Sequence, residues 1–332
     1  MSPAILNSWK TALQGKRMST IDIIIPTYKP DQAFFHMIDD LEKQAIRPAH
    51  IIIMNTEKKY WDELVLKSAE NPVEKYDNII LKHISKAEFD HGNTRNQGVA
   101  LSDADFFLMM TQDAFPRDKM LLSNLSKALT DDVAAAYARQ YPKTDCNLAE
   151  RYSRKFNYPN EPMKKTQADV EKLGIKTYFC SNVCAMYRRD IFDKLGGFTK
   201  RTIFNEDMVY AGTACQNGYA ICYVPDAGVI HSHNYTCMQQ FHRNFDLGVS
   251  QTDHPEIFAS LKSESEGKKM VSQTIEHFRS LGKAYLVPHY VVMCGFRLIG
   301  YKLGRSYKLL PKSLRAAFSL NKEYWNGDLN GT

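Results

Sequence analysis

Four short apolar runs, separated by segments with a helical pattern, constrain the fold of this chain more than any other feature. Near-continuous apolar runs of this length are typical of strands that are buried on both faces of a parallel sheet. The segments between them, at about 32–44, 60–68 and 93–101, have helical patterns, and Asn93 or Thr94 is the expected N-cap of the last. The alternation predicts right-handed βαβ units and an α/β fold with a mostly parallel sheet. The runs are IDIIIP (21–26), HIIIMN (50–55), NIILKHI (78–84) and FFLMMT (106–111).

All four runs end in polar residues. The carboxyl ends of parallel strands meet at one edge of a sheet, and ligands bind in the crevice beyond that edge. The sequence therefore predicts one polar crevice at these strand ends. The ends are Pro26-Thr27-Tyr28, Asn55-Thr56-Glu57, Ser85 and Gln112-Asp113.

The second half of the chain continues the mixed pattern. Residues 132–142 predict a fifth strand, and the polar segment 143–176 predicts a mobile loop or a helical insert over the crevice. Residues 177–198 are expected to form a strand, a helix and a Gly-Gly turn. We expect a helix with an acidic first turn over 204–219, then a strand, a Pro-Asp turn and a second strand over 220–233.

Composition narrows the class of protein. The chain has 332 residues, 44% of them hydrophobic and 24% charged, which suits one large α/β domain with an appendage or two modest domains. A net charge of +6 with 37 acidic residues does not indicate a nucleic-acid-binding surface. The seven cysteines form no Cys-x-x-Cys pair, which favours reduced thiols and a cytoplasmic location. Residues 1–20 lack the apolar core of a signal peptide, and no transmembrane helix is expected.

The C-terminal region, from about 237 to 332, has a helical pattern and a strongly basic segment. No Asp or Glu occurs from His277 to Lys322, whereas basic, aromatic and aliphatic residues alternate there. That composition is typical of a helix lying in a membrane interface. The alternative is a helical subdomain that packs on the core and leaves a basic face in water. The basic residues are Arg279, Lys283, Arg297, Lys302, Arg305, Lys308, Lys312, Arg315 and Lys322.

Two motifs near the strand ends are candidates for anion and metal binding. Asp113 follows a buried run, where its carboxylate could hold a hard cation against a diphosphate or could simply cap the next helix. The segment from His91 to Gly98 precedes a helix, so its backbone N–H groups and the Arg95 fork could receive an anion. The glycines Gly92 and Gly98 permit tight turns and close packing. An ordinary loop is the alternative for this segment.

Two further motifs lie later in the chain. Glu206 and Asp207 begin a predicted helix, where acids either complement the helix dipole or act as a general base toward a sugar hydroxyl. His231 and His233 alternate on a predicted strand and therefore point to the same side, as metal ligands or as a satisfied surface pair. No Gly-x-Ser-x-Gly, Walker or Gly-x-Gly-x-x-Gly motif occurs, which removes the usual support for hydrolases, P-loop enzymes and dinucleotide-binding dehydrogenases.

Taken together and in this order, the motifs resemble family 2 glycosyltransferases of the GT-A fold, and more narrowly bacterial rhamnosyltransferases of surface polysaccharide synthesis. The resemblance covers residues 21–236 approximately, and a weaker similarity extends over residues 301–325. It implies a Rossmann-like sheet flanked by helices in a catalytic domain over 21–236, with a donor half at about 21–115 and an acceptor half at about 116–236. The motifs are IIIPTYKP (23–30), FDHGNTRNQG (89–98), TQDAFP (111–116), CSNVCAMYRRDIFDKLGGF (180–198), FNEDMVYAG (204–212) and VIHSHNYT (229–236).

The resemblance also implies roles for single residues. Asp207 matches the catalytic base, and Asp113 and His231 match metal ligands for Mn²⁺ or Mg²⁺, although His233 remains an alternative to His231. The family's acidic residues are absent at two positions. At the first, Asn55 and Glu57 are left as candidates for contacting the edge of the nucleotide base. At the second, the metal-binding motif is reduced to Thr111-Gln112-Asp113. The residues implied to bind the nucleotide-sugar are Pro26, Thr27, Tyr28, Asn55, Glu57, His91, Gly92, Arg95, Gln112 and Asp113.

The function implied is inverting transfer of a sugar to a hydroxyl of a lipid-linked glycan. The expected donor is dTDP-rhamnose, and the expected place is the inner face of the cytoplasmic membrane, with the enzyme bound peripherally. One alternative is a non-catalytic nucleotide-sugar-binding or scaffold subunit at the membrane. A sugar nucleotidyltransferase is a weaker alternative, because IIIPTYKP lacks the glycine-rich loop of that class.

Overall fold

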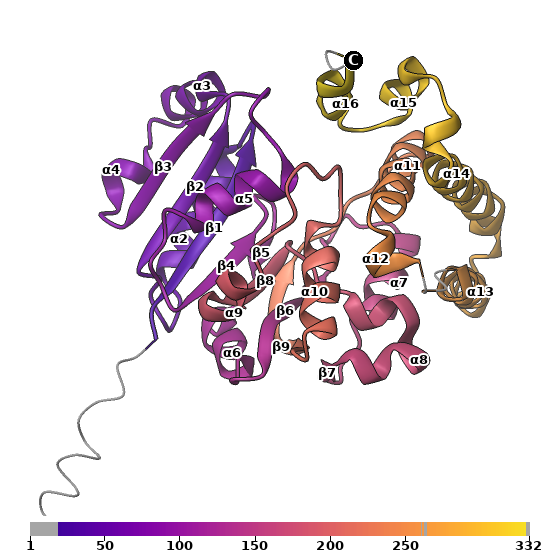
Figure 1. Ribbon diagram of the computed structural model, residues 1–332, viewed down its shortest axis with the longest axis horizontal. Helices are drawn as coiled ribbons and strands as arrows, with labels where there is room; N and C mark the ends of the chain where they lie inside the picture. Colours follow the sequence, from indigo (N-terminus) through magenta and orange to yellow (C-terminus); the bar gives the residue numbers. More distant parts are fainter. Residues whose placement is uncertain (1–18, 260, 262–263, 330–332) are drawn as a thin grey trace, which may run out of the picture.

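The computed structural model describes residues 19–259, 261 and 264–329 (Figure 1). Most of the predicted N-terminal extension, residues 1–18, lies outside them. Nine strands of the described chain form one sheet in the order β3-β2-β1-β4-β8-β6-β9-β5, with β7 paired to β9. Helices flank this sheet, and further helices of the C-terminal region lie beside it. The α/β class and the helical C-terminal region are therefore confirmed.

The four apolar runs form the first half of the sheet, and their parallel pairing confirms the prediction. Ile23 lies beside Ile51 in the register of β1 and β2, and Ile51 lies beside Ile79 in the register of β2 and β3. The β4 strand pairs with the other edge of β1, also in parallel. The strands are β1 (Ile21–Tyr28), β2 (His50–Thr56), β3 (Ile79–Ile84) and β4 (Phe106–Met110).

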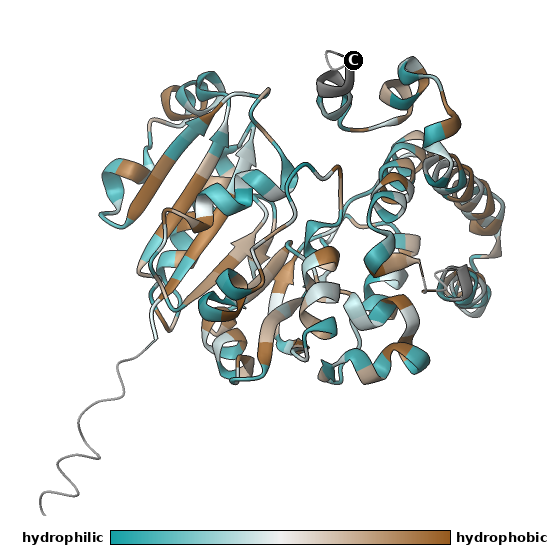
Figure 2. Ribbon diagram, viewed as in Figure 1, coloured by the Kyte–Doolittle hydropathy of each residue, from teal (hydrophilic) through white to brown (hydrophobic). Residues whose placement is uncertain are grey.

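Burial on both faces explains why the runs of β1, β2 and β4 are nearly continuously apolar, whereas β3 at the edge of the sheet carries the exposed Lys82. Ile23 and Ile25 pack in one hydrophobic cluster, whereas Ile24 between them packs in the cluster on the other face, and all three have an exposed fraction of 0%. Successive side chains of a strand point to opposite faces, so a strand covered on both sides cannot alternate apolar with polar residues. Figure 2 shows the resulting brown strands at the centre of the sheet.

The connecting helices are α2 (Gln32–Glu42), α3 (Lys58–Ser68), α4 (Pro72–Lys75) and α5 (His91–Val99). The N-cap of α5 is Asp90, so the predicted cap at Asn93 or Thr94 is wrong. Asp90 has an extended backbone, and its carboxylate accepts a hydrogen bond from the backbone N–H of Asn93 at 2.7 Å. An aspartate at this position is a stronger cap than a residue inside the first turn. His91 and Gly92 consequently lie in the first turn of α5.

The second half of the sheet combines antiparallel and parallel pairs. The β8 strand is antiparallel to both β4 and β6, and β9 is parallel to β6 but antiparallel to β5 and β7. The elements are β5 (Phe115–Pro116), α6 (Leu121–Ala128), β6 (Val133–Tyr141), α7 (Leu148–Asn157), β7 (Met163–Lys165), α8 (Val170–Leu173), β8 (Cys184–Arg188), α9 (Arg189–Lys194), α10 (Glu206–Gln216) and β9 (Ala220–Ile230).

Two predictions for this half need correction. Residues 220–230 form one strand, because the pairing with β6 steps from Val224 directly to Gly228 and leaves the Pro-Asp dipeptide in an irregularity instead of a turn. Proline is tolerated at such a place because it has no N–H to donate. Residues 174–178 form a 3₁₀ turn, so the strand expected from 177 onward starts only at Cys184. The helical-insert alternative for 143–176 is the one observed.

The C-terminal region consists of helices packed closely on one another. The α11 and α14 helices cross where Gly300 and Gly304 face α11; a Cβ on Gly300 would lie 2.3 Å from the carbonyl oxygen of Phe241. Within the described part of the chain, no helix combines the length and apolar character that crossing a bilayer requires. The helices are α11 (Cys237–Asp253), α12 (Pro255–Phe258), α13 (Glu264–Ser280), α14 (Val287–Arg305), α15 (Lys312–Phe318) and α16 (Lys322–Leu329).

The glycine contact gives a test of this packing. Gly300→Ala forces α14 away from the α11 backbone and is expected to lower the free energy of unfolding by about 1–3 kcal/mol. Gly295→Ala, in the same helix, is the control, because its added Cβ would contact no other part of the protein beyond its own helix turn and alanine favours a helix over glycine by about 1 kcal/mol. Urea unfolding followed by circular dichroism measures both. Equal stability of the two variants would contradict the close crossing.

Candidate active site

The carboxyl ends of β1 and β4 are joined by one side chain. The backbone N–H of Tyr28 donates to Oε1 of Gln112 at 2.8 Å, and Nε2 of Gln112 donates to the Tyr28 carbonyl at 3.1 Å. This pair of bonds draws the Pro26–Tyr28 segment and Asp113 to the same edge of the sheet, where the polar crevice was predicted. The Tyr28 ring remains 41% exposed and meets Tyr60 edge-on, with 5.5 Å between ring centroids.

The end of β2 is tied into the sheet by a buried amide. Asn55 is fully buried; its Oδ1 accepts from the Thr27 hydroxyl at 3.0 Å, and its Nδ2 lies 2.9 Å from Nδ1 of His83. Burial lowers the pKa of His83, which keeps that ring neutral and able to accept. Glu57 follows with a positive φ of 68° and accepts at 2.7 Å from the backbone N–H of Lys86. The side chain of Asn55, on β2, is thus hydrogen-bonded to Thr27 of β1 on one side and to His83 of β3 on the other.

Asp113 and the two histidines converge on one point. The Asp113 Oδ2 atom lies 3.4 Å from Nε2 of His231 and 3.1 Å from Nε2 of His233, and the two Nε2 atoms are 3.0 Å apart. Both histidines follow the end of β9, so they meet Asp113 from the loop and not from a strand as expected. The three residues form a group whose ligand atoms all lie within 4.8 Å of one another.

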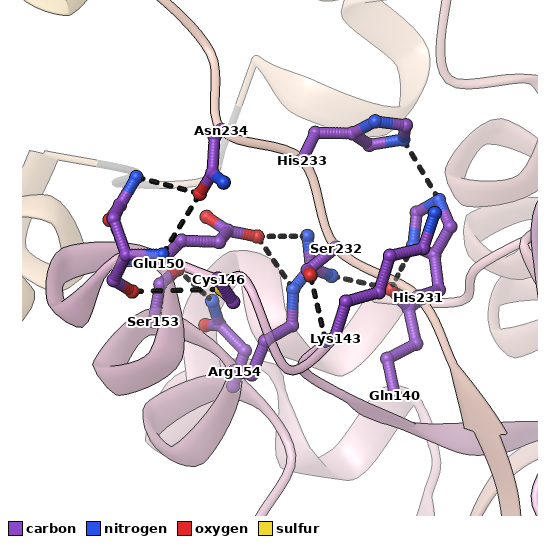
Figure 3. Close-up of polar contacts among 12 residues, drawn as sticks. Gln140, Lys143, Cys146, Glu150, Ser153, Arg154, His231, Ser232, His233 and Asn234 are labelled. Atoms are coloured by element: carbon purple, nitrogen blue, oxygen red, sulfur yellow. Dashed lines mark hydrogen bonds and ion pairs between the residues drawn. The ribbon is translucent and has the colours of Figure 1, made fainter.

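The tautomer of His231 is fixed by its surroundings (Figure 3). Its Nδ1 lies 3.0 Å from Oε1 of Gln140, and the same Oε1 accepts from Nη1 of Arg154. Because arginine can only donate, the Gln140 oxygen must face it, and Nδ1 of His231 must carry the proton. Nε2 of Gln140 donates to the Ser181 hydroxyl at 3.0 Å and completes the arrangement. The lone pair on Nε2 of His231 therefore points toward Asp113.

Charge within this group is divided between the acid and the imidazoles. Burial opposes ionisation of Asp113, but its contacts with the two neighbouring imidazoles outweigh burial and hold the pKa of this carboxyl well below its usual range. Burial lowers the pKa of His231, which keeps the imidazole neutral. A carboxylate and neutral imidazole nitrogens are suitable ligands for Mn²⁺, and a carboxylate alone suits Mg²⁺. The donor set thus fits the predicted metal.

A second group surrounds the paired acids at the start of α10. The Asp207 Oδ2 atom accepts from the backbone N–H of Asn182 at 2.9 Å, and the Glu206 Oε1 atom accepts from Nδ2 of Asn182, also at 2.9 Å. Arg95 is buried, and its Nε lies 3.2 Å from Oε1 of Glu206. Nη1 of Arg95 donates to the carbonyl of His91. Arg95 thus contacts Glu206 in this structure, instead of extending freely into the crevice.

The two acids have different pKa values. Burial would raise the pKa of Glu206, but the positive charge of Arg95 outweighs it and lowers this pKa. Burial and the neighbouring Glu206 carboxylate raise the pKa of Asp207 to about 7. Adjacent titratable groups pushed apart in this way mark an acid–base site, since a base works best near the operating pH. The Asp207 residue itself is only partly exposed.

The glycines of α5 serve close packing. A Cβ on Gly92 would lie 1.8 Å from the carbonyl oxygen of Thr199, and one on Gly98 would lie 2.5 Å from Cγ2 of Ile24. The helix is therefore pressed between β1 and the loop that leads to Glu206. Because α5 lies this close to its neighbours, Arg95 contacts Glu206, and His91 lies near the same carboxylate.

Comparisons with known proteins identify the family of this chain. Residues 22–196 match the family model described as glycosyl transferase family 2. The chain belongs to this family. This membership confirms the prediction of a glycosyltransferase and the resemblance on which it was based.

Two curated relatives resemble this family 2 glycosyltransferase along most of its length. The O-antigen chain rhamnosyltransferase RfbN of Salmonella typhimurium is 37% identical over 309 residues, which are 92% of this chain and 96% of that protein. The O-antigen chain rhamnosyltransferase WbaN of Salmonella anatum is 37% identical over 316 residues, with coverage of 93% and 96%.

A solved structure shows the same fold. The mannosyltransferase PcManGT from Pyrobaculum calidifontis, in complex with GDP-Man and Mn²⁺, superposes with a TM-score of 0.53 at 14% identity, covering 98% of this chain and 93% of that one. At this identity the likeness concerns the fold, and it confirms the GT-A prediction.

Sequence reasoning missed the residues that hold the site residues in place. Gln140, Arg154 and Asn182 do not belong to a recognisable spacing, and only the tertiary structure brings them to His231 and Asp207. Asn182 does lie inside the quoted segment CSNVC, where it could have been considered. His83 was quoted only as part of an apolar run.

The Gln140 contact predicts a loss of metal affinity when it is removed. Gln140→Ala frees the His231 ring to rotate or change tautomer, and partners of this kind typically account for about 10–100-fold in metal affinity. Titration of the full chain with Mn²⁺, followed by electron paramagnetic resonance, measures the change. Gln140→Glu is the matched control, because its carboxylate still accepts from His231 and Arg154. Unchanged Mn²⁺ affinity in Gln140→Ala would contradict the positioning role.

Proposed function

We propose that this family 2 glycosyltransferase transfers L-rhamnose from dTDP-rhamnose, with inversion, to a hydroxyl of a lipid-linked glycan in surface polysaccharide synthesis. The end-to-end similarity to two O-antigen chain rhamnosyltransferases supports the sugar and the pathway class. The observation that carries the chemistry is the pairing of a carboxyl of raised pKa, Asp207, with the Asp113–histidine group at one edge of the sheet.

Asp207 is the proposed general base. With a pKa of about 7 it is half ionised at neutral pH, so it can accept the proton of the acceptor hydroxyl as that oxygen attacks the anomeric carbon. Asn182 holds the carboxylate through its backbone N–H, and Glu206 stays ionised beside Arg95. The permanent negative charge of Glu206 keeps the proton affinity of Asp207 high. Arg95 is thus proposed to act through Glu206.

The leaving diphosphate is proposed to lie at Asp113. Mn²⁺ or Mg²⁺, held there by Asp113 with His231, His233 or both, would supply positive charge against the departing oxygens. Asp113 is ionised and His231 presents its Nε2 lone pair, so both are ready to bind without first losing a proton.

The nucleotide is proposed to lie along the ends of β1 and β2. The exposed Tyr28 ring offers a flat face for the base, and Pro26 and Thr27 form the wall behind it. Glu57 remains the proposed contact to the base edge, whereas the buried Asn55, bonded to Thr27 and His83, is proposed to support this edge from within the sheet. Gln112 fixes the Tyr28 backbone. His91 and Gly92, in the first turn of α5, are the proposed contacts nearest the diphosphate.

The outer face of α14 is proposed to bind the inner surface of the cytoplasmic membrane. Tyr290 and Met293 are buried, whereas Val291, Val292, Leu298 and Ile299 are each at least half exposed. The basic residues that flank these side chains are unbalanced by any acid from His277 to Lys322. A basic helix with an exposed apolar stripe is attracted to anionic lipid and buries its apolar residues in the interface.

Replacing the base tests the catalytic assignment. Asp207→Asn is expected to lower kcat by about 10²–10⁴-fold while donor binding is retained, because only the proton acceptor is lost. In the wild type, kcat/KM at saturating Mn²⁺ should rise with pH and reach half its maximum near pH 7, since Asp207 must lose its proton to act. Turnover of dTDP-rhamnose with a lipid-linked acceptor measures both. A near wild-type rate in Asp207→Asn would refute the assignment.

Donor hydrolysis separates the proposed enzyme from the alternative of a scaffold subunit. In the presence of Mn²⁺, the enzyme should slowly hydrolyse dTDP-rhamnose in preference to UDP- and GDP-sugars. Binding of a donor without any hydrolysis would favour the scaffold.

The membrane proposal predicts a dependence on the α14 stripe. The double variant Val292→Asp, Ile299→Asp should bind vesicles containing anionic phosphatidylglycerol at least about tenfold more weakly than the wild type, because each charge must leave water. Co-sedimentation with vesicles at low salt measures binding, and donor hydrolysis verifies that the fold is intact. If the wild type does not sediment with these vesicles, α14 is only a packed helix of a subdomain.

A further inference from the structure

A hollow of about 310 Å³ opens beside the end of β6, on the side of the α7 helix. Its walls come from the last residues of β6, from one face of α7 and from His277 of α13. The α7 residues that line it recur at helical spacing, so they project from the same face. They are Arg151, Tyr152, Arg154, Lys155 and, at the helix end, Tyr158. The volume is at the lower end of the range of about 300–1,000 Å³ that is typical of small-molecule sites.

The lining is strongly basic. It includes three arginines and one lysine, and no acidic residue belongs to it. Within the described part of the chain, the ion pair found among these cations is that of Arg154 with Glu150. Arg151 donates instead to the backbone carbonyls of Thr144 and Cys146. Because most of the positive charge is not balanced by a carboxylate, the hollow favours an anionic ligand.

Aromatic rings supply the rest of the walls. The Tyr152 ring packs on the His277 ring with 4.7 Å between centroids and 30° between planes. Tyr158 is 3% exposed and has the Arg154 guanidinium 6.0 Å from its ring centroid. Flat apolar faces next to cationic groups suit a ligand that has both a ring and a phosphate, since the ring packs on the aromatics while guanidinium groups bind the phosphate oxygens.

The hollow shares a wall with the candidate active site. Gln140 lines it and also accepts the hydrogen bond from His231. The neighbouring residue, Tyr141, accepts at 2.8 Å from the backbone N–H of His231. On the other side, Gln140 donates to Ser181, the residue before Asn182, which holds Asp207. Gln140 therefore separates the hollow from His231, and the chain of contacts through Gln140, Ser181 and Asn182 connects the hollow to Asp207.

From these observations we infer that the hollow is a binding subsite for a phosphorylated saccharide. Its assignment to the acceptor rests on the proposed function: a glycan linked to a lipid through phosphate has a sugar ring next to phosphate oxygens, which is the chemistry that this lining recognises. The same chemistry can come from the phosphate at the lipid end or from an acidic group within the glycan.

Binding of defined probes tests the subsite on the full chain. Glucose 1-phosphate, glucose and inorganic phosphate are titrated by calorimetry in the presence of EDTA, which prevents metal-dependent binding at Asp113. Glucose 1-phosphate should bind more tightly than either fragment, because it alone uses both the rings and the cations. Comparison of farnesyl diphosphoglucose with glucuronic acid then identifies the source: tighter binding of the first indicates the lipid end, and of the second an acidic sugar.

A charge reversal locates the binding. Lys155→Glu should weaken glucose 1-phosphate at least about fivefold, since a cation facing the phosphate becomes an anion. Lys127→Glu is the matched control, because Lys127 is also an exposed lysine in the last turn of a helix but lies in α6, away from the hollow. Equal affinities of the two variants, or equal affinity of the wild type for glucose and glucose 1-phosphate, would overturn the inference.

Donor hydrolysis distinguishes this inference from the proposed function. Neither lysine belongs to the catalytic groups, so both variants should hydrolyse dTDP-rhamnose with Mn²⁺ as the wild type does. If the wild type does not hydrolyse the donor while binding of glucose 1-phosphate still depends on Lys155, the subsite stands and the proposed activity fails. If the wild type hydrolyses the donor but binding of glucose 1-phosphate does not depend on Lys155, the proposed activity stands and the subsite fails.

Discussion

Burial of β1, β2 and β4 on both faces is the constraint on which the rest of the structure depends. Ile23, Ile24 and Ile25 are successive residues of β1, yet each is fully buried. Strands covered in this way leave few positions for polar side chains along their faces. The candidate site residues Asp113 and Glu57 accordingly lie beyond strand ends, and Gln112 joins two of these ends by hydrogen bonds to Tyr28.

Different surroundings give the two aspartates of the candidate site different pKa values. Two histidines make Asp113 a stronger acid, whereas burial beside Glu206 makes Asp207 a weaker one. Arg95 keeps Glu206 charged, and Arg154, acting through Gln140, decides which nitrogen of His231 carries a proton. Two buried or half-buried arginines thus set the protonation of the groups that are proposed to act on the substrate.

The sequence was informative where local patterns determine structure. Apolar runs predicted the parallel strands, and the polar residues after them predicted the crevice edge at Asp113. It was uninformative where distant residues decide: the Gln140–Arg154 contact depends on how α7 folds back on β6, and no spacing in the sequence encodes it. The N-cap of α5 was misplaced because the helix begins at His91, directly after Asp90, and not at the later Asn93 or Thr94. The continuous β9 strand was missed because the Pro225-Asp226 pair is typical of a turn, whereas pairing with β6 on both sides of this pair keeps β9 continuous.

The glycine crossing of α11 and α14 has a mechanical consequence. The α11 helix begins after Thr236, only three residues beyond His233, and its first turn is closed by reciprocal bonds between Thr236 and Gln239. On its other side, α11 touches α14 backbone to backbone, with no side chain between them to absorb movement. The outer face of α14 and His233 are consequently connected by a short path, which consists of the close helix crossing, α11 and the three residues before it.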